Sequence, residues 1–202
     1  MTKTSSSRTP IIKNYSKNVS DSKQFVNSLP RVPLLTVIVQ FDLPHSTDDM
    51  INDSKKTITN MLIHNKSCKE IIEKEYGAKT IKEMGDAVFA LFNSVPAACD
   101  CALNIIHNLQ KYGKGISTKA TVTAGTVELI QTRCEPDIYG LPVNLCNRMS
   151  KYAKDGSVLI EESRFPEVQY WLTDDQKIKF GKPKKEKLLN FGFVKLRKIS
   201  LK

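Results

Sequence analysis

The chain has 202 residues, of which 40% are hydrophobic and 26% are charged, so it is long enough for one globular domain with a sizeable core. No apolar run approaches the ~18–20 residues that a membrane-spanning helix needs, which excludes an ordinary helical membrane protein. The five cysteines form no CxxC pair, and their odd number suits a reducing compartment, so we expect a cytoplasmic protein.

The net charge of +10 is concentrated at the two ends of the chain. Residues 1–31 carry +5 and residues 177–202 carry +9, which leaves −4 for residues 32–176. Solvated tails are one interpretation of the basic ends, and contact with a polyanion or an acidic membrane surface is the other. We expect residues 1–31 to be a flexible basic leader and residues 32–202 to be the folded domain.

Hydrophobic periodicity divides the first half of the chain into four predicted units. The predicted units are a buried strand, a long amphipathic helix, a hairpin that turns at Gly85 and a second helix, at Pro33–Asp42, Asp48 to about Tyr76, Lys79–Met84 with Asp86–Phe92, and Pro96–Tyr112. Cys99 and Cys101 lie in the apolar pattern of the second helix, so we expect both to be buried.

The second half alternates between shorter units. We expect a strand, then a hairpin arm or irregular loop, a helix, a short strand and two late strands around a Lys-rich turn, at Ser117–Gly125, Thr126–Asp137, Leu141–Ala153, Val158–Ile160, Ile178–Phe180 and Phe193–Ile199. The order β-α-β-β-α-β predicts an α+β fold with a ferredoxin-like sheet and extra C-terminal α and β elements. That fold hosts many activities, so function depends on the site.

Asp42 ends the first predicted strand and is followed by a short polar turn into a helix. The start of a helix offers unpaired N–H groups that bind phosphate, so a carboxylate beside it suits a metal–phosphate site. An aspartate that only caps the turn is the alternative. Asp86 lies at the tip of the predicted hairpin, after Gly85. If the hairpin neighbours the first strand, the two carboxylates can hold Mg²⁺ or Mn²⁺ against substrate phosphates.

A third pattern lies on the predicted helix after Gly140. Asn144 and Arg148 are four residues apart and so share one helix face. An amide beside a guanidinium can orient a ribose and neutralise charge on a phosphoryl group. A solvent-facing pair without function is the alternative.

Together these patterns resemble the class III adenylyl/guanylyl cyclase family. The resemblance rests on Lys82-x-x-Gly85-Asp86, on Asp137-Ile138-Tyr139-Gly140 and on Val143-Asn144-x-x-x-Arg148, in that order. It covers roughly Leu34 to Ile199 and includes Gly125, where the family has a glycine in its central strand. It implies that the chain is a nucleotidyl cyclase, with residues 32–202 as its catalytic domain.

The resemblance also implies a role for each matching residue. Asp42, Asp86 and the carbonyl of Leu43 would bind two divalent cations, Mg²⁺ or Mn²⁺. Backbone N–H groups of the loop that ends in His45, Ser46 and Thr47 would bind the triphosphate. Lys82 and Asp137 would read the base, and Asn144 and Arg148 would stabilise the transition state. Four lysines are candidates for a further phosphate contact: Lys182, Lys184, Lys185 and Lys187.

The base-reading pair favours ATP as the substrate, because Lys82 can donate to a ring nitrogen and Asp137 can accept from an exocyclic amine. Free-standing members of this size also resemble the pyrimidine cyclases that make cyclic UMP or CMP in bacterial antiphage defence, which is the alternative. The family resemblance implies a head-to-tail homodimer. The central strands show no aromatic run that would bind RNA, so we expect no nucleic-acid partner.

The chain departs from the family pattern at one position. The family loop usually has a glycine where this chain has His45. A side chain there restricts the backbone approach to phosphate. The departure raises the question of whether the loop keeps its geometry.

Overall fold

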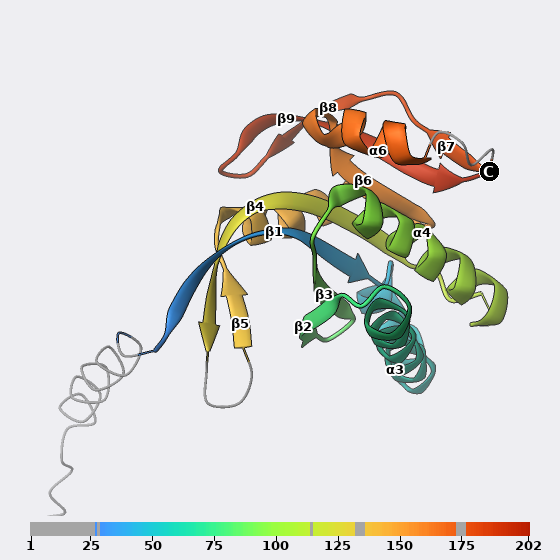
Figure 1. Cartoon of the computed structure of the whole chain (residues 1–202). Coiled ribbons are helices and arrows are strands. Elements are labelled where there is room, and N and C mark those ends of the chain that lie inside the picture. The colour runs from blue at the N-terminus through green and yellow to red at the C-terminus, as the bar shows by residue number, and fades with distance from the viewer. Residues whose placement is uncertain (1–26, 28, 114, 132–135, 173–176) are drawn as a thin grey trace, which may run out of the picture.

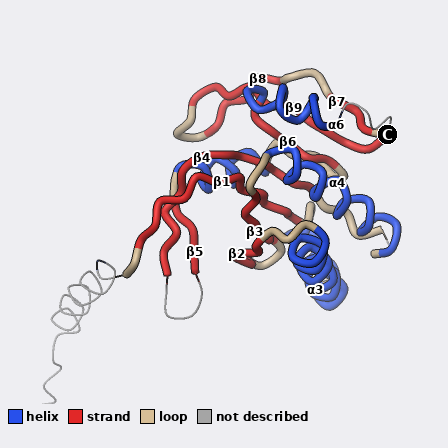
Figure 2. The backbone as a smooth tube through the Cα atoms, in the orientation of Figure 1, coloured by secondary structure: helices blue, strands red, loops and turns tan. Residues whose placement is uncertain are grey.

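The computed structural model describes residues 27, 29–113, 115–131, 136–172 and 177–202 (Figure 1). Helices and strands are interspersed along the chain (Figure 2). In chain order the described elements are β1 (Arg31–Asp42), α2 (Ser46–Asn52), α3 (Ser54–Glu70), the π-helical turn η1 (Ile71–Glu75), β2 (Lys79–Met84), β3 (Ala87–Phe92), α4 (Val95–Tyr112), β4 (Lys119–Gln131), β5 (Pro136–Tyr139), α5 (Leu141–Ser150), β6 (Ser157–Glu161), the 3₁₀ turn η2 (Glu162–Arg164), α6 (Phe165–Leu172), β7 (Ile178–Phe180), β8 (Lys184–Leu188) and β9 (Gly192–Leu201).

The described strands form one nine-stranded sheet in the order β2-β3-β1-β4-β6-β9-β7, with β5 paired to β4 and β8 paired to β9. Among these pairings, β4 with β6 is parallel and the others are antiparallel. The part β4-β1-β3-β2, with α3 and α4, is the predicted ferredoxin-like unit. The helices α5 and α6 and the strands β6 to β9 are the extra C-terminal elements, so the predicted fold class is confirmed.

Helices cover both faces of this sheet, and β1 shows how the sequence fits between them. Val39 and Phe41 point to the face covered by α3, α4 and α6, whereas Ile38 points to the face covered by α5. Figure 1 shows α4 and α6 on the near side of the sheet. Cys99 and Cys101 are buried in α4, as predicted. Of the described helices, none is both long enough and apolar enough to cross a membrane.

The prediction of a single helix from Asp48 to about Tyr76 is wrong. The backbone of Asp53 is extended, with φ −151° and ψ 85°, and its carboxylate accepts a hydrogen bond from the Lys56 N–H. Asp53 therefore caps α3 and separates it from α2. The helix ends as a π-helical turn, η1. Three residues of the predicted apolar face are exposed: Ile51, Ile58 and Leu62. Ile51 lies on α2, which buries no residue, and the other two lie outside the face of α3 that is buried.

The segment after Gly125 is the arm of a hairpin, one of its two predicted forms, because β4 continues to Gln131 and pairs with β5. Two other segments of the second half differ from their prediction. The helix α5 ends at Ser150, three residues earlier than predicted. The Lys-rich segment forms the strand β8 and is no turn. The segment contains too few apolar residues for its pattern to indicate a strand. The reason is that β8 lies at an edge of the sheet, where lysines are common.

Candidate active site

The carboxylate of Asp42 lies at the end of β1, where three elements meet. The pairing of β1 with β4 places Asp42 opposite Lys119, and Lys119 Nζ lies 3.1 Å from Asp42 Oδ2. The Ser150 hydroxyl, at the end of α5, donates a hydrogen bond of 2.8 Å to the same oxygen. The side chains of the ion pair are 17% and 21% exposed, so solvent screens them only partly. A cation and a hydroxyl therefore fix the orientation of Asp42.

Strand pairing brings Asp86 to the same end of the sheet. Phe41 pairs with Val88 across β1 and β3, which places the end of β1 beside the start of β3. Asp42 follows Phe41 and Asp86 precedes β3, so the two predicted metal acids lie at the same end of the β1–β3 pair. Gly85 forms the turn with φ +61°, a backbone conformation that favours glycine.

The loop after Asp42 links the two acids. Ser46, the first residue of α2, donates a hydrogen bond of 2.5 Å from its hydroxyl to Asp86 Oδ2. The next residue, Thr47, is exposed, and Leu43 is buried beneath the loop. The predicted phosphate loop therefore lies between the two carboxylates, and one of its side chains contacts an acid directly.

His45 adopts the backbone conformation that a glycine would favour. Its φ of 63° and ψ of 9° lie in the left-handed helical region. Its exposed ring lies 3.6 Å from the carboxylate of Asp155, through Nε2 and Oδ2. The loop therefore keeps a left-handed residue at the position where the family has glycine.

The predicted base-reading residues are in contact. Lys82 Nζ lies 2.9 Å from Asp137 Oδ2, and the lysine also lies 5.8 Å from the centre of the Tyr139 ring. Burial raises the pKa of Asp137, but hydrogen bonds from Lys82, Tyr139 and the Ile138 N–H outweigh it and lower the pKa below its ordinary value. Because its pKa is lowered, the Asp137 carboxylate is ionised. The pair joins β2 to β5, so two strands fix its position.

Asn144 and Arg148 lie on α5, the helix on the opposite face from α3 and α4. The helix can dock closely because Gly125 has no Cβ atom. A Cβ atom there would lie 2.7 Å from Pro142 Cγ, which is too close without a shift of the helix. The Thr123 hydroxyl also donates a 3.0 Å hydrogen bond to the Pro142 carbonyl. Asn144 is exposed and Arg148 is half-buried. Among the described residues, no hydrogen bond or ion pair joins either of them to Asp42 or Asp86.

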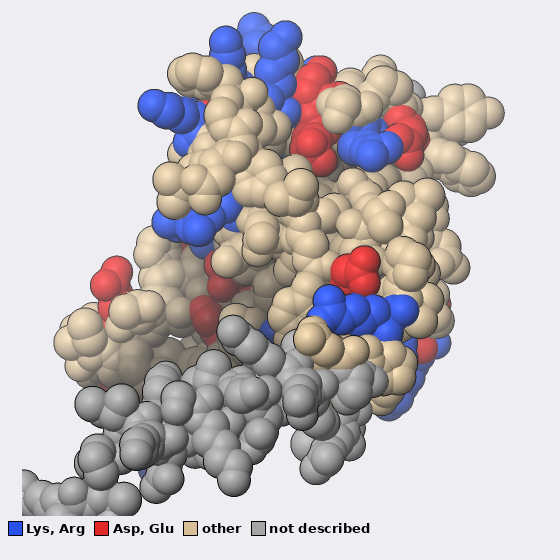
Figure 3. Space-filling view, turned by 90° about the vertical axis from the view of Figure 1, so that its left-hand side faces the viewer, with Lys and Arg blue, Asp and Glu red and all other residues tan. Residues whose placement is uncertain are grey.

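The four candidate lysines divide between two sides of the β8–β9 hairpin. Lys182 and Lys184 line a hollow of about 380 Å³, together with Lys154 and Lys198. Lys185 lies over the ring of Phe193 instead, 4.7 Å from its centre. Figure 3 shows basic side chains gathered at the top of the molecule, where this hairpin lies. Lys182 and Lys184 therefore lie in a hollow with other lysines, whereas Lys185 does not line it.

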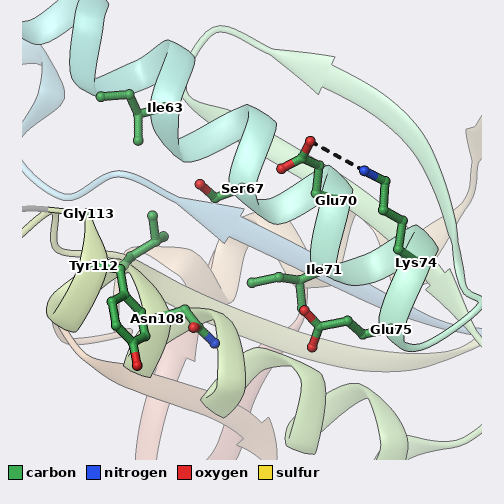
Figure 4. Close-up of a pocket in the computed structure, with 10 residues that line it drawn as sticks. Ile63, Ser67, Glu70, Ile71, Lys74, Glu75, Asn108, Tyr112 and Gly113 are labelled. Carbon is green, nitrogen blue, oxygen red and sulfur yellow. Dashed lines mark hydrogen bonds and ion pairs between the residues drawn. The ribbon is translucent and has the colours of Figure 1, made fainter.

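Another hollow, of about 370 Å³, lies away from this site, between α3 and α4 (Figure 4). An ion pair of 3.5 Å between Lys74 and Glu70 lies at its rim, and Ile63 and Tyr112 contribute apolar surface. None of the predicted site residues lines this hollow.

Sequence reasoning missed two contacts of Asp42. Lys119 lies in a predicted strand, but the register that places it opposite Asp42 cannot be read from one strand. Ser150 lies at the end of a helix that was predicted three residues too long. Both contacts depend on long-range pairing, so no local signal indicates them.

No protein-family model and no curated protein matches the chain. Solved structures do match it. An adenylate/guanylate cyclase/hydrolase from Silicibacter pomeroyi has a TM-score of 0.71 and 18% identity, over 86% of this chain and 100% of that one. The catalytic core of a rhodopsin-guanylyl cyclase with converted specificity, in complex with ATPαS, has a TM-score of 0.67 and 20% identity, over 85% and 99%. The adenylyl cyclase CyaB from P. aeruginosa has a TM-score of 0.61 and 16% identity, over 86% and 97%.

These similarities extend over most of the chain and nearly all of each matched domain. The chain therefore has the fold of class III adenylyl and guanylyl cyclase catalytic domains, which confirms the resemblance that the sequence motifs indicated.

Proposed function

We propose that this chain is a nucleotidyl cyclase, which converts a nucleoside triphosphate to a 3′,5′-cyclic nucleotide and pyrophosphate. The observation that carries the proposal is the position of Asp42 and Asp86 at the same end of the β1–β3 pair, in a chain with a cyclase fold. Two of the similar structures are a cyclase core in complex with ATPαS and a guanylate cyclase domain from Catenaria anguillulae in complex with GTP.

The donor atoms at this end of the sheet suit two divalent cations, Mg²⁺ or Mn²⁺. Among the described residues, Asp42 and Asp86 each accept hydrogen bonds through Oδ2, so Oδ1 of each remains for a cation. The Leu43 carbonyl is the proposed backbone ligand. Mg²⁺ usually takes one or two carboxylates and keeps waters and substrate phosphates as its other ligands. When bound, the cations lower the pKa of the ribose 3′-hydroxyl and neutralise charge on the phosphates.

The residues around the acids would hold the triphosphate for in-line attack on its α-phosphate. Backbone N–H groups of His45, Ser46 and Thr47 would bind phosphate oxygens at the start of α2. The charge of Lys182 or Lys184 would attract the terminal phosphates from the β8–β9 side. Ser46 would keep Asp86 oriented through their hydrogen bond.

Asn144 and Arg148 would act at the reacting phosphate and the ribose. Arg148 has no hydrogen-bond partner among the described residues, so its guanidinium can bind a phosphoryl group. Because neither residue contacts the acids of its own chain, we propose that they serve the site of a partner in a head-to-tail homodimer. Removing such a donor usually slows turnover about 10²–10³-fold.

ATP is the proposed preferred substrate. Lys82 would donate to a ring nitrogen of adenine, and the ionised Asp137 would accept from the exocyclic amine. Cytosine also presents a ring acceptor beside an amine, so the same pair favours CTP as the second candidate. Uracil lacks the amine, which makes UTP the weaker of the two pyrimidine substrates.

A direct assay tests this function. Purified protein is incubated with Mg²⁺ or Mn²⁺ and each of the four nucleoside triphosphates, and the products are separated by chromatography. We expect a cyclic nucleotide and pyrophosphate, with ATP used fastest. Chelation of the metal should stop the reaction.

Substitution of the acids tests the metal site within the same assay. Asp42→Ala and Asp86→Ala should each abolish cyclisation, because each removes a hard oxygen ligand. Glu73→Ala, which removes an exposed acid on η1, is the matched control and should keep full activity. Circular dichroism checks that each variant is folded. Cyclic product from either aspartate variant at the wild-type rate would refute the metal assignment.

A further inference from the structure

A chain of hydrogen bonds runs through α3 next to the two acids. His64 is fully buried, and its Nε2 lies 2.8 Å from the Thr118 hydroxyl. Its Nδ1 lies 3.0 Å from Oδ1 of the neighbouring Asn65. Two adjacent residues of one helix therefore form the middle of a polar network that reaches in both directions.

Both ends of this network terminate on the backbone of the turns that carry the acids. The Thr118 hydroxyl lies 3.2 Å from the carbonyl oxygen of Asp42. Asn65 Nδ2 donates a hydrogen bond of 2.9 Å to the carbonyl oxygen of Gly85, the residue before Asp86. The network thus connects the backbone at one acid to the backbone beside the other.

The protons of the network follow from these contacts. Asn65 uses its amide N–H on Gly85, so its oxygen faces His64 Nδ1, which must carry a proton. Burial lowers the pKa of His64, and this effect outweighs the hydrogen bond to Asn65 and the fields of Asp86 and Asp42. The Thr118 hydroxyl has one proton, which it can donate either to Nε2 of the neutral imidazole or to the Asp42 carbonyl, so it lies between these two acceptors.

A purely structural role does not require this arrangement. An apolar side chain at position 64 would fill the same buried space without the cost of desolvating an imidazole. The polar chain instead ends at the two backbone positions that determine where Asp42 and Asp86 stand.

We propose that His64, Asn65 and Thr118 are positioning residues, which fix the spacing between the carboxylates of Asp42 and Asp86 for a pair of divalent cations. The inference rests on the proposed function, since it assigns these residues to the same metal site. Mg²⁺ requires nearly ideal octahedral geometry, so a small displacement of one acid weakens binding. Loss of the groups that orient metal ligands usually costs 10–100-fold in metal affinity or activity.

Paired substitutions separate the hydrogen bond from the packing. Thr118→Val keeps the shape and removes the hydroxyl, whereas Thr118→Ser keeps the hydroxyl. His64→Gln places an amide where Nε2 lies and keeps the reach to Thr118, whereas His64→Asn reaches only the position of Nδ1. Asn65→Ala removes the bond to Gly85 at a partly exposed helix position, where alanine favours the helix.

The measurement is Mn²⁺ binding to each full-length variant, by titration followed with electron paramagnetic resonance, beside kcat with the preferred nucleotide and the melting temperature. We expect Thr118→Val, His64→Asn and Asn65→Ala to bind Mn²⁺ about tenfold or more weakly and to lose kcat. Thr118→Ser and His64→Gln should stay within about threefold of the wild type. Affinity that follows the hydrogen bond and not the melting temperature supports positioning.

Two results would overturn the inference, and they differ from each other. Wild-type Mn²⁺ affinity and kcat in Asn65→Ala and in Thr118→Val would show that the network is structural, while the cyclase assignment would stand. Absence of both Mn²⁺ binding and cyclisation in the unaltered protein would remove the metal site itself, and the proposed function would fail with it. If Thr118→Val does not fold, Asn65→Ala decides between these results.

Discussion

At the scale of single residues, the proposed substrate choice rests on the Lys82–Asp137 pair. The lysine keeps the carboxylate ionised, so the pair presents one donor and one acceptor at a fixed separation of 2.9 Å. Guanine presents the opposite arrangement of donor and acceptor. A site that hydrogen-bonds one base discriminates strongly against a base that leaves those groups unpaired.

Exchange of this pair should therefore change the base that is cyclised. We expect the double variant Lys82→Glu with Asp137→Cys to lose at least about tenfold in its preference for ATP over GTP, measured as the ratio of the two kcat/KM values. Lys79→Glu, on the same strand, is the control for the charge change and should keep the preference. If UTP or CTP outcompetes ATP with the unaltered protein, the pyrimidine reading replaces the adenylyl one.

His45 gives a second prediction at this scale, about stability. A residue with a Cβ atom pays roughly 1 kcal/mol to hold the left-handed conformation in which His45 lies. The free energy of unfolding should therefore be about 1 kcal/mol higher for His45→Gly than for His45→Ala. Glycine offsets part of this difference, because it raises the conformational entropy of the unfolded chain. Both variants lose the contact with Asp155, so the comparison isolates the backbone.

Chemical denaturation with urea measures the difference between these two variants. Equal stability of His45→Gly and His45→Ala would show that the loop relaxes out of the left-handed conformation when the imidazole is removed. In that case the glycine position of the family would not be preserved in this chain.

At the scale of elements, the local patterns of the sequence predicted well those segments that are buried on one or two faces. The strands β1, β3 and β9 and the helix α4 have a clear apolar period, β2 is indicated by the turn at Gly85, and all five were found close to their predicted bounds. Asp42 ends β1 and Asp86 directly precedes β3, so both could be located from these elements.

Elements that depend on distant partners were not predictable in the same way. The strand β8 is recognisable only from its pairing with β9, since its own sequence is mostly lysine. The helix α6 was not predicted, and Val168 and Leu172 provide its buried side. Asp53 divides a long helical pattern because a capping aspartate favours a helix start more than a helix interior. The network of His64 and Thr118 likewise joins segments 54 residues apart.

The strand β9 gives the prediction for this scale. It lies between β6 and β7 in the sheet and also pairs with β8, and its Leu196 and Ile199 are buried. A chain that ends at residue 192 would leave β6 unpaired on one side and expose that core. We expect this truncation to aggregate or to lose cooperative unfolding, whereas removal of residues 1–25 should leave catalysis largely intact.

Thermal unfolding followed by circular dichroism, together with the cyclase assay, checks both truncations. A folded and active protein that ends at residue 192 would show that β9 is dispensable. Loss of activity on removal of residues 1–25 would give the basic leader a part in the reaction.

At the scale of the whole molecule, the two sets of site residues point to an assembly. The proposed metal acids, Asp42 and Asp86, lie where β1 meets β3, whereas Asn144 and Arg148 lie on α5, with no hydrogen bond or ion pair to those acids among the described residues. One chain that carries both sets favours a C₂ homodimer with two equivalent sites.

Complementation tests this assembly. Asp42→Ala protein and Arg148→Ala protein should each be nearly inactive alone, since every site in either homodimer lacks one residue. When the two are mixed under conditions of subunit exchange, a mixed dimer has one site with both defects and one site with neither. Random exchange of equal amounts makes half of the dimers mixed, so activity should return to about a quarter of the wild-type value.

A mixture of Asp42→Ala with Asp86→Ala is the matched control: both changes affect the same half of the site, so no mixed dimer has an intact site and no activity should return. Exchange is verified with two differently tagged chains. Verified exchange without recovery in the first mixture, or a fully active monomer at low concentration, would refute the shared site.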